Sequence, residues 1–297
     1  MPDRDKLQGF IFDQFDIRGE ILTLEKSYAE AIARGNYPQL IKHLLGEFMA
    51  AAGMLSATLK FDGVLTLQAQ GPGPLSMIMA DCTRHHNLRA IASIDHAYDF
   101  NTDESLAALV GKGTLSLTID PSNGERYQGI VPLESENLAN CLEDYFTRSE
   151  QLRTRIWLAA DTELGSSPRA AGLLLQALPR QLETSAEENL QMWEHTTQLA
   201  NTITLEEQLT LDHEQQLHRL FHQEPLRLFE AKPVRFNCSC SKERISQALL
   251  SLGEKELNSI LDEAGLVAID CQFCGQHYRF TRDDIQQLFD ESPPVLH

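Results

Sequence analysis

The sequence is poor in basic residues. It has 25 lysines and arginines against 43 aspartates and glutamates, which gives a formal net charge of −18. Proteins that bind nucleic acid without sequence preference need basic surface to neutralise the phosphates. The charge balance therefore argues against nucleic acid as a partner, and it favours solubility.

Long apolar runs are missing as well. No run approaches the roughly 18–20 residues of a membrane-spanning helix, so we expect no membrane partner. Residues 1–6 are polar and no apolar h-region of a signal peptide follows them, so we do not interpret this end as a secretory signal peptide. We therefore expect a cytoplasmic protein, where thiols stay reduced and paired cysteines more often bind metal or carry out redox chemistry.

Motifs of common enzyme sites are also lacking. The stretch 71–74 (Gly-Pro-Gly-Pro) matches neither GxxxxGK[ST] nor GxGxxG, and we interpret it as a turn. No Ser/His/Asp arrangement or carboxylate pair has a supporting spacing, and His85 and His86 fit a polar loop. Cys82 and Cys141 are interpreted as reduced core cysteines. We expect no catalytic residue and no enzyme activity.

What is present is a chain of 297 residues, 42% hydrophobic, enough for one large domain and a smaller one. We predict an α+β class, with a core domain at 1–179 that combines a mainly antiparallel sheet with packed helices. An Asp-Gly dipeptide predicts a hairpin within residues 60–67. Periodicity predicts helices at 39–59 and 135–152, and strands at 75–80, 88–94, 114–119, 127–131, 156–160 and 172–178.

Residues 180–231 differ in character, with ten acidic and three basic residues and many Gln, Glu and Thr. Helical periodicity continues, because Leu190, Trp193 and Ile203 can share one apolar stripe. Thr and His have mediocre helix propensity, so these helices should be stable only when docked on another surface. The segment is either an ordinary helical connector or a metastable linker that can be released.

Residues 232–297 form a third, compact piece. Amphipathic patterns predict helices at 244–252 and 254–263, and strand patterns occur at 266–269 and 278–280. About 65 residues is marginal for a free-standing core, and domains of this size usually need a staple such as a bound metal.

Four of the six cysteines lie in this piece as a CxC pair and a CxxC pair separated by thirty residues: Cys238, Cys240, Cys271 and Cys274. Two tight thiol pairs predict a tetrahedral site for one structural zinc ion. Strand-like sequence follows the CxxC pair, which disfavours a thioredoxin-type site at a helix start. Four thiolates fill the shell and leave no open position for zinc hydrolase chemistry.

The zinc site has an energetic consequence. Structural zinc contributes roughly 10–16 kcal/mol in small peptides, and a domain's net stability is only about 5–15 kcal/mol. Oxidising the thiolates to disulfides would eject the metal and remove a contribution as large as that stability. The C-terminal domain should then unfold, and linker helices docked on it should loosen. A switch from oxidation to unfolding is therefore chemically available.

The sequence resembles the redox-regulated 33-kDa heat-shock chaperone family of bacteria. Gln272 stands where many members have an acidic residue, which should not affect zinc ligation. The resemblance covers nearly the whole chain, at residues 18–19, 59–63, 70–74, 125–131, 172–176, 236–244, 271–274 and 278–280.

The resemblance implies an ATP-independent holdase that is monomeric and inactive when reduced and zinc-bound. Oxidative stress, especially with heat, would release the zinc, unfold the linker and form two disulfides, Cys238–Cys240 and Cys271–Cys274. The oxidised form would become a homodimer and bind unfolding client proteins. It would later pass them to ATP-dependent chaperones.

Client binding needs exposed apolar surface. We hypothesise that the linker face with Leu190, Trp193 and Ile203 provides it, together with the sheet beneath. Three alternatives stay open: a zinc-ribbon nucleic-acid-binding protein, which the overall acidity opposes, a thiol-disulfide oxidoreductase that uses the CxxC pair, and a constitutive scaffold whose zinc is purely structural.

Overall fold

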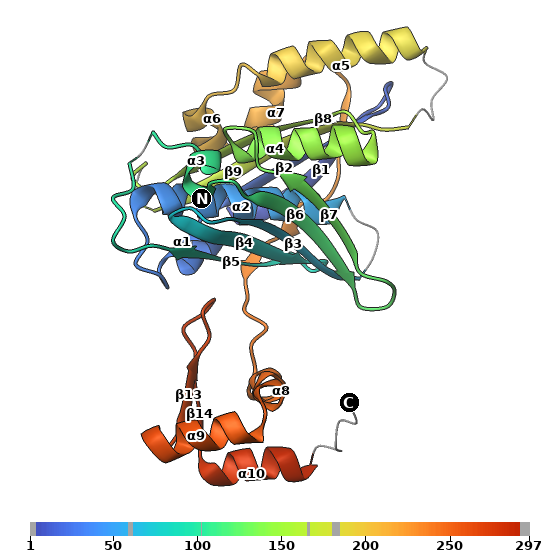
Figure 1. Cartoon of the computed structure of the whole chain (residues 1–297). Coiled ribbons are helices and arrows are strands. Elements are labelled where there is room, and N and C mark those ends of the chain that lie inside the picture. Colours follow the sequence, from blue (N-terminus) through green and yellow to red (C-terminus); the bar gives the residue numbers. More distant parts are fainter. Residues whose placement is uncertain (1–3, 59–61, 102, 165–166, 180–184, 292–297) are drawn as a thin grey trace. The chain divides into compact units, whose positions relative to one another are not determined.

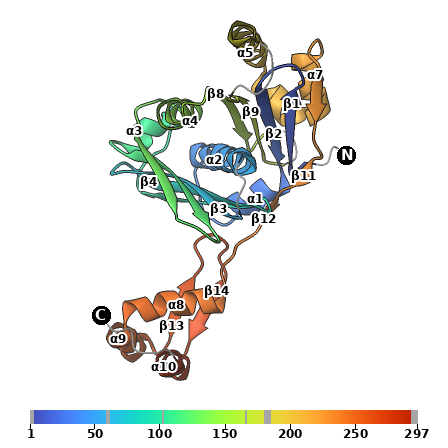
Figure 2. The same cartoon turned by 90° about the vertical axis from the view of Figure 1, so that its right-hand side faces the viewer.

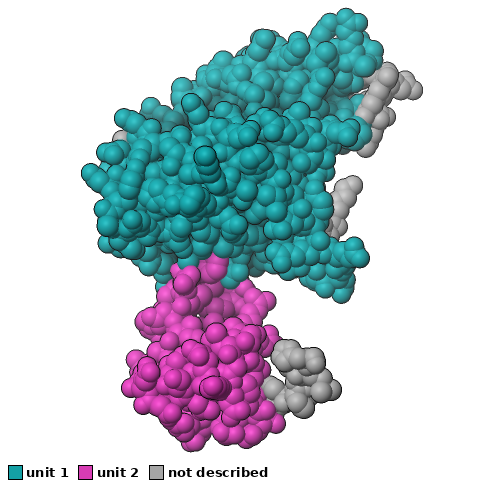
Figure 3. Space-filling model, viewed as in Figure 1, with its two compact units in different colours: residues 1–237 teal, residues 238–297 magenta. Residues whose placement is uncertain are grey.

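The computed structural model describes residues 4–58, 62–101, 103–164, 167–179 and 185–291. The chain divides into two compact units, residues 1–237 (unit 1) and residues 238–297 (unit 2) (Figure 3). Unit 1 holds two large sheets, and unit 2 holds the four paired cysteines.

The two sheets of unit 1, which we name sheet A and sheet B, are both six-stranded (Figure 1). Sheet A has the order β10-β1-β2-β9-β8, with β11 also paired with β1, and consists of β1 (Lys6–Phe12), β2 (Ile17–Leu24), β8 (Thr154–Asp161), β9 (Arg169–Ala177), β10 (Leu226–Leu228) and β11 (Lys232–Pro233). Sheet B has the order β12-β5-β4-β3-β6-β7 and consists of β3 (Gly63–Gln70), β4 (Leu75–Thr83), β5 (Asn87–Ile94), β6 (Thr114–Pro121), β7 (Tyr127–Pro132) and β12 (Arg235–Phe236). Among the described residues, only β12 pairs in parallel, with β5.

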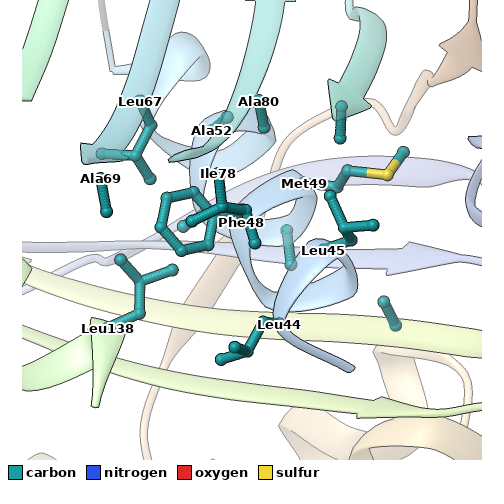
Figure 4. Packing of buried hydrophobic residues seen from close by; sticks show 14 of the residues in the cluster. Leu44, Leu45, Phe48, Met49, Ala52, Leu67, Ala69, Ile78, Ala80 and Leu138 are labelled. Carbon is teal, nitrogen blue, oxygen red and sulfur yellow. The ribbon is translucent and has the colours of Figure 1, made fainter. Parts of the chain in front are cut away.

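Helix α2 (Gln39–Ala57) lies between the two sheets (Figure 2) and forms the centre of the main core. Its side chain Phe48 is fully buried among residues of sheet B such as Leu67 and Ile78 (Figure 4). On the side of sheet A, a Cβ at Gly46 would come within 2.7 Å of the Ala160 Cβ. The absence of a side chain at this position therefore lets the helix approach the sheet closely.

Three further helices of unit 1 are α1 (Lys26–Ile32), α3 (Leu106–Val110) and α4 (Leu138–Tyr145), and α4 continues into a π-helical turn at Phe146–Glu150. The Glu143 carboxylate on α4 accepts hydrogen bonds from the Ile156 backbone N–H and the Arg155 guanidinium, both at 2.8 Å. Because these contacts occupy the outer side of β8, α4 protects that edge of sheet A from further strand pairing.

Three helices follow the core domain in the chain: α5 (Ala186–Ala200), α6 (Leu205–Thr210) and α7 (His213–Phe221). We call them the linker helices. Each begins at a capping box, in which the N-cap side chain and the residue three positions later bond each other's backbone N–H groups. The N-cap residues are Ser185, Thr204 and Asp212. These local signals explain why a segment of mediocre helix propensity forms three short helices.

The linker helices cover the face of sheet A that points away from α2. On β9, Leu174 packs into the main core, whereas Leu173 and Leu175 pack against the linker helices. This second face forms a core of its own, with exposed fractions of 9% or less, from Phe10, Phe12, Ile17, Ile21, Leu173, Leu175, Trp193, Ala200, Leu217, Leu220 and Phe221. Leu209 of α6 extends the cover onto Ala159 and Ala171.

The described part of unit 2, residues 238–291, consists of three helices and one hairpin: α8 (Lys242–Leu252), α9 (Glu254–Ala264), α10 (Arg282–Glu291), β13 (Val267–Asp270) and β14 (His277–Phe280). Its core is small, with Leu249, Leu257, Leu261, Val267, Phe280 and Ile285 as the buried members. A core of this size supplies little stability in a single small domain.

The predicted α+β class with antiparallel sheets is confirmed. The hairpin predicted within residues 60–67 is wrong, because Gly63 is itself the first residue of β3, and β3 pairs on its two sides with the later strands β4 and β6. Residues 60 and 61 of that stretch, the expected end of α2 at residue 59, and residues 180–184 at the start of the linker lie outside the described residues. Strands β1 and β2 and helix α10 were not predicted.

We expect Phe221→Ala to weaken the docking of the linker helices. The Phe221 ring is 1% exposed and its centroid lies 5.4 Å from that of Phe12. Removing a buried aromatic ring typically costs about 3–5 kcal/mol. Limited proteolysis with cleavage sites mapped by mass spectrometry should show faster cutting within residues 186–221. Leu205→Ala on α6, where the side chain is 50% exposed, is the matched control and should leave the cleavage rate unchanged.

Candidate metal centre

The CxxC motif lies in the turn between β13 and β14. The Cys271 backbone N–H donates to the Gln276 carbonyl at 2.9 Å, and the Gly275 N–H donates to the Cys271 carbonyl at 2.7 Å. Gly275 has φ of 67°, a left-handed conformation that glycine adopts without a steric penalty. A strand rather than a helix follows the motif, as the sequence predicted, so the CxxC pair does not lie at the helix start that is typical of thioredoxin-type sites.

The CxC motif lies directly before α8. Ser241 is the N-cap of that helix and accepts a hydrogen bond from the Arg244 N–H at 3.3 Å. The Arg244 guanidinium reaches back to the carbonyl and hydroxyl oxygens of Ser239, at 3.1 and 2.6 Å. Because Ser239 separates the two cysteines, these contacts fix the loop that presents Cys238 and Cys240.

The two motifs bring four sulfurs together, as the sequence predicted. All four Sγ atoms lie within 4.8 Å of one another, with 3.6 Å between those of Cys238 and Cys271 and 3.3 Å between those of Cys240 and Cys274. Four thiolates around one tetrahedral zinc, with Zn–S bonds of about 2.3 Å, would lie about 3.8 Å apart. The cluster therefore fits one zinc ion. Among the described residues, it is the only such group of cysteine, histidine or carboxylate ligands.

The hydroxyl of Tyr278 donates a hydrogen bond to the Cys240 Sγ at 3.1 Å. Burial acts to raise the pKa of Cys240, but hydrogen bonds from Tyr278 and the neighbouring thiols outweigh it and lower the pKa to about 7. His277 is exposed and lies 2.5 Å from an Asp270 carboxylate oxygen. It is therefore a surface residue outside the sulfur cluster.

The two remaining cysteines are buried in unit 1, as predicted. Cys82 is fully buried and lies 3.1 Å from the Ser56 hydroxyl. Burial raises the pKa of Cys82 to about 12, and that of Cys141 is raised for the same reason. Neither thiol therefore has the character of a reactive thiolate.

The three residues hypothesised to bind clients occupy different environments. Trp193 is 9% exposed and packs against sheet A. Ile203 is half-buried and packs against the same apolar cluster, and Leu190 is 37% exposed. In this state, the linker face is therefore mostly covered by the sheet. Sequence reasoning missed Phe10 and Phe12, which form the opposing surface. Their alternate positions within the apolar segment 7–12 are the signal that could have found them.

Polar contacts also hold the linker helices on the N-terminal part of the chain. His213, the first residue of α7, is 7% exposed, and its ring nitrogens lie 3.2 Å from the Thr23 hydroxyl and from the Gln8 side-chain oxygen. A neutral imidazole satisfies both contacts, donating to Gln8 and accepting from Thr23. The Arg4 guanidinium donates to the Leu209 carbonyl at 2.6 Å.

The fold and the cysteine cluster together define an α+β protein with a small C-terminal domain that carries a cluster of four thiols able to hold a metal ion. The model of the Hsp33 protein family matches residues 5–281. A 33 kDa chaperonin from Azotobacter vinelandii is 51% identical over 290 residues, 97% of this chain and 96% of the relative. One from Pseudomonas fluorescens is 49% identical over 97% of this chain and 95% of the relative. The chain belongs to the Hsp33 family.

The crystal structure of the 33 kDa chaperonin from Thermotoga maritima has the same fold. It matches with a TM-score of 0.83 and 22% identity, covering 97% of this chain and 98% of that one. Family membership supports a chaperone function. No helix in the described parts of the chain has the length and apolar character needed to cross a bilayer.

We expect acid to loosen the linker through His213. Burial is the main cause that lowers its pKa to about 4, and nearby Lys6 lowers it further, while Asp212 opposes the shift. Since the unfolded imidazole titrates near 6.5, the stabilisation is complete above about pH 6.5 and is lost as the pH falls towards 4. Between pH 7 and 4.5 the loss is about 2–3 kcal/mol.

Urea unfolding followed by tryptophan fluorescence measures this loss, because Trp193 lies against sheet A and Trp157 bonds Asn201 at 3.0 Å. His213→Gln removes the titrating group. In this variant the free energy of unfolding should therefore fall by about 2–3 kcal/mol less between pH 7 and 4.5 than it does in the wild type. An equal pH dependence in wild type and His213→Gln would rule out a contribution from His213.

Proposed function

We propose that this protein is an ATP-independent holdase chaperone that is inactive when reduced and zinc-bound and is activated by oxidation. The observation that carries the proposal is the covered apolar face of sheet A, where Phe10, Phe12, Ile17 and Ile21 lie under the linker helices. A folded protein that stores such a surface can bind unfolding proteins once the cover is removed. The cytoplasm is the compartment in which its thiols would be reduced at rest.

The zinc ion would be held by the four thiolates and would supply most of the stability of unit 2. Among the residues described for this unit, the core has six buried apolar members. Structural zinc is worth roughly 10–16 kcal/mol in small domains near neutral pH. Release of the metal therefore leaves unit 2 without enough stabilisation to stay folded.

Oxidation supplies the trigger. Two thiolates react with one hydrogen peroxide to give a disulfide and two hydroxide ions, and a disulfide sulfur is a poor zinc ligand. We infer the pairs Cys238–Cys240 and Cys271–Cys274. Disulfides within each motif leave the two motifs unlinked once the zinc has gone, whereas disulfides between the motifs would keep unit 2 closed.

The segment between α7 and the first zinc ligand connects the trigger to the cover. Residues 222–237, which we call the strap, contain the short strands β10, β11 and β12, each of two or three residues. These strands hold the strap on the two sheets, because β10 and β11 pair with β1 and β12 pairs with β5. The last contact is the Asn237 N–H, which donates to the Leu88 carbonyl at 3.0 Å. When unit 2 unfolds, these few hydrogen bonds and the packing of Val234 and Phe236 against the main core are left to hold the end of the strap. Heat can then release the strap together with the linker helices.

Release would expose both sides of the apolar core between sheet A and the linker helices. On the linker side, Leu190, Trp193 and Ile203 would become available to clients, and on the sheet side Phe10 and Phe12 would. Exposed apolar surface of this kind also favours a homodimer of the oxidised form. The net charge of −18 would keep complexes with clients in solution. Transfer of clients to ATP-dependent chaperones would follow on return to reducing conditions.

The proposal is tested by treating the reduced, zinc-loaded protein with hydrogen peroxide at elevated temperature. We expect release of one zinc per chain, loss of helical circular dichroism, and a rise in suppression of client aggregation. Cys274→Ser removes one ligand and should abolish stoichiometric zinc binding, whereas the matched control Cys141→Ser should retain it. Zinc release without a rise in aggregation suppression would contradict the switch, and retained zinc under strong oxidant would contradict the trigger.

A further inference from the structure

Cys240 has a partner from outside the four cysteines. The Tyr278 hydroxyl donates to its Sγ at 3.1 Å, across 38 residues of sequence. Cys240 also lies 3.3 Å from the Cys274 sulfur. A phenol hydroxyl on a metal-ligating sulfur acts on the electrons that the sulfur uses for bonding and for nucleophilic attack.

The fold of unit 2 holds this hydroxyl in place. Tyr278 lies on β14 opposite Ile269 of β13, and both side chains pack against the core of the unit. The adjacent strand residue His277 is exposed and bonded to Asp270. Because side chains alternate along a strand, the hairpin register directs Tyr278 towards the inner side of the unit. This packing anchors the Tyr278 ring and directs its hydroxyl towards the Cys240 Sγ.

We propose that Tyr278 is a positioning residue that protects Cys240 and sets the oxidant threshold of the metal centre. The inference rests on the proposed zinc-thiolate switch and adds a residue that controls its speed. A hydrogen bond to a thiolate engages a sulfur lone pair and makes the sulfur a weaker nucleophile. Among the four cysteine thiolates, Cys240 should therefore react most slowly with peroxide, and oxidation should begin at another sulfur.

The affected step is the attack of a thiolate on hydrogen peroxide. A sulfur lone pair forms an S–O bond, the O–O bond breaks, and the products are a sulfenic acid and hydroxide. A second thiolate then attacks the sulfenic sulfur, forms the S–S bond and expels a second hydroxide. The two sulfurs lose two electrons in total and the peroxide gains them. The Tyr278 proton competes for the lone pair in the first step, so it slows attack by Cys240.

Tyr278→Phe tests the proposal because it keeps the ring and removes only the hydroxyl. Reduced, zinc-loaded full-length chains are mixed with excess peroxide, and zinc release is followed with a chromogenic chelator. We expect release to be about fivefold faster in Tyr278→Phe, which corresponds to a hydrogen bond of about 1 kcal/mol. An unchanged rate would overturn the proposal.

Thr281→Ala is the matched control within unit 2. The Thr281 hydroxyl donates to Asp284 at 2.6 Å at the start of α10, so its loss loosens the unit without touching a sulfur. We expect its zinc release to stay near the wild-type rate. Acceleration equal to that of Tyr278→Phe would show that general loosening explains the effect and would overturn the proposal.

Two readouts are independent of the switch. In the cobalt-substituted protein, Tyr278→Phe should shift the sulfur-to-metal charge-transfer bands, because one thiolate loses a hydrogen bond. In the reduced, zinc-loaded wild type, where the metal would keep all four sulfurs deprotonated, singly alkylated species should contain less modified Cys240 than Cys238 or Cys274, all three being half-buried. Unshifted bands together with equal alkylation would overturn the role of Tyr278. Failure of peroxide to release zinc from any variant would instead contradict the proposed function.

Discussion

The second face of sheet A is the constraint on which the rest of the structure depends. An ordinary antiparallel sheet packs one face on a core and leaves the other to solvent. Here Leu173 and Leu175 make the far side of β9 as apolar as the near side, which contains Leu174. Fully burying each such side chain is worth about 1.5–3 kcal/mol. The protein must therefore cover this face, and the linker helices are the cover.

The cover is held by contacts of limited strength. Its helices are short and depend on capping boxes and on docking, since isolated helices of this length are marginal in water. The buried neutral His213 fixes α7 on sheet A, and a hydrogen bond from the Arg4 guanidinium fixes the end of α6. Strand pairs of two or three residues fix the strap. Such contacts suit a surface that is stable at rest and can be uncovered by a change at one end.

Much of this arrangement could be predicted from the sequence. The spacing of the CxC and CxxC motifs was sufficient to predict that four sulfurs meet, because ligand pairs of this kind have few geometric solutions. Strands β4 to β9 followed from apolar alternation and turn residues. The stripe of Trp193 and Ile203 indicated docking, and both side chains do pack at the second core.

The features that could not be predicted from the sequence depend on tertiary structure. Strand β2 was not predicted because Ile21, Leu22 and Leu24 are buried on both faces, which removes the alternation that marks a strand. The Asp-Gly dipeptide at 62–63 led to the wrong prediction of a hairpin, because turn residues of this kind also occur between a helix and a strand. The bond from Tyr278 to Cys240 depends on the register of a hairpin and on the position of a distant loop. No local pattern carries that information.

The measurement that tests the central claim most directly is hydrogen exchange by mass spectrometry before and after oxidative zinc release. The account predicts that peptides of α5 to α7 and of β1 and β2 lose protection when zinc leaves at elevated temperature, while peptides of α2 stay protected. Zinc loss with full protection retained in α5 to α7 would contradict it, because the apolar face of sheet A would then still be covered.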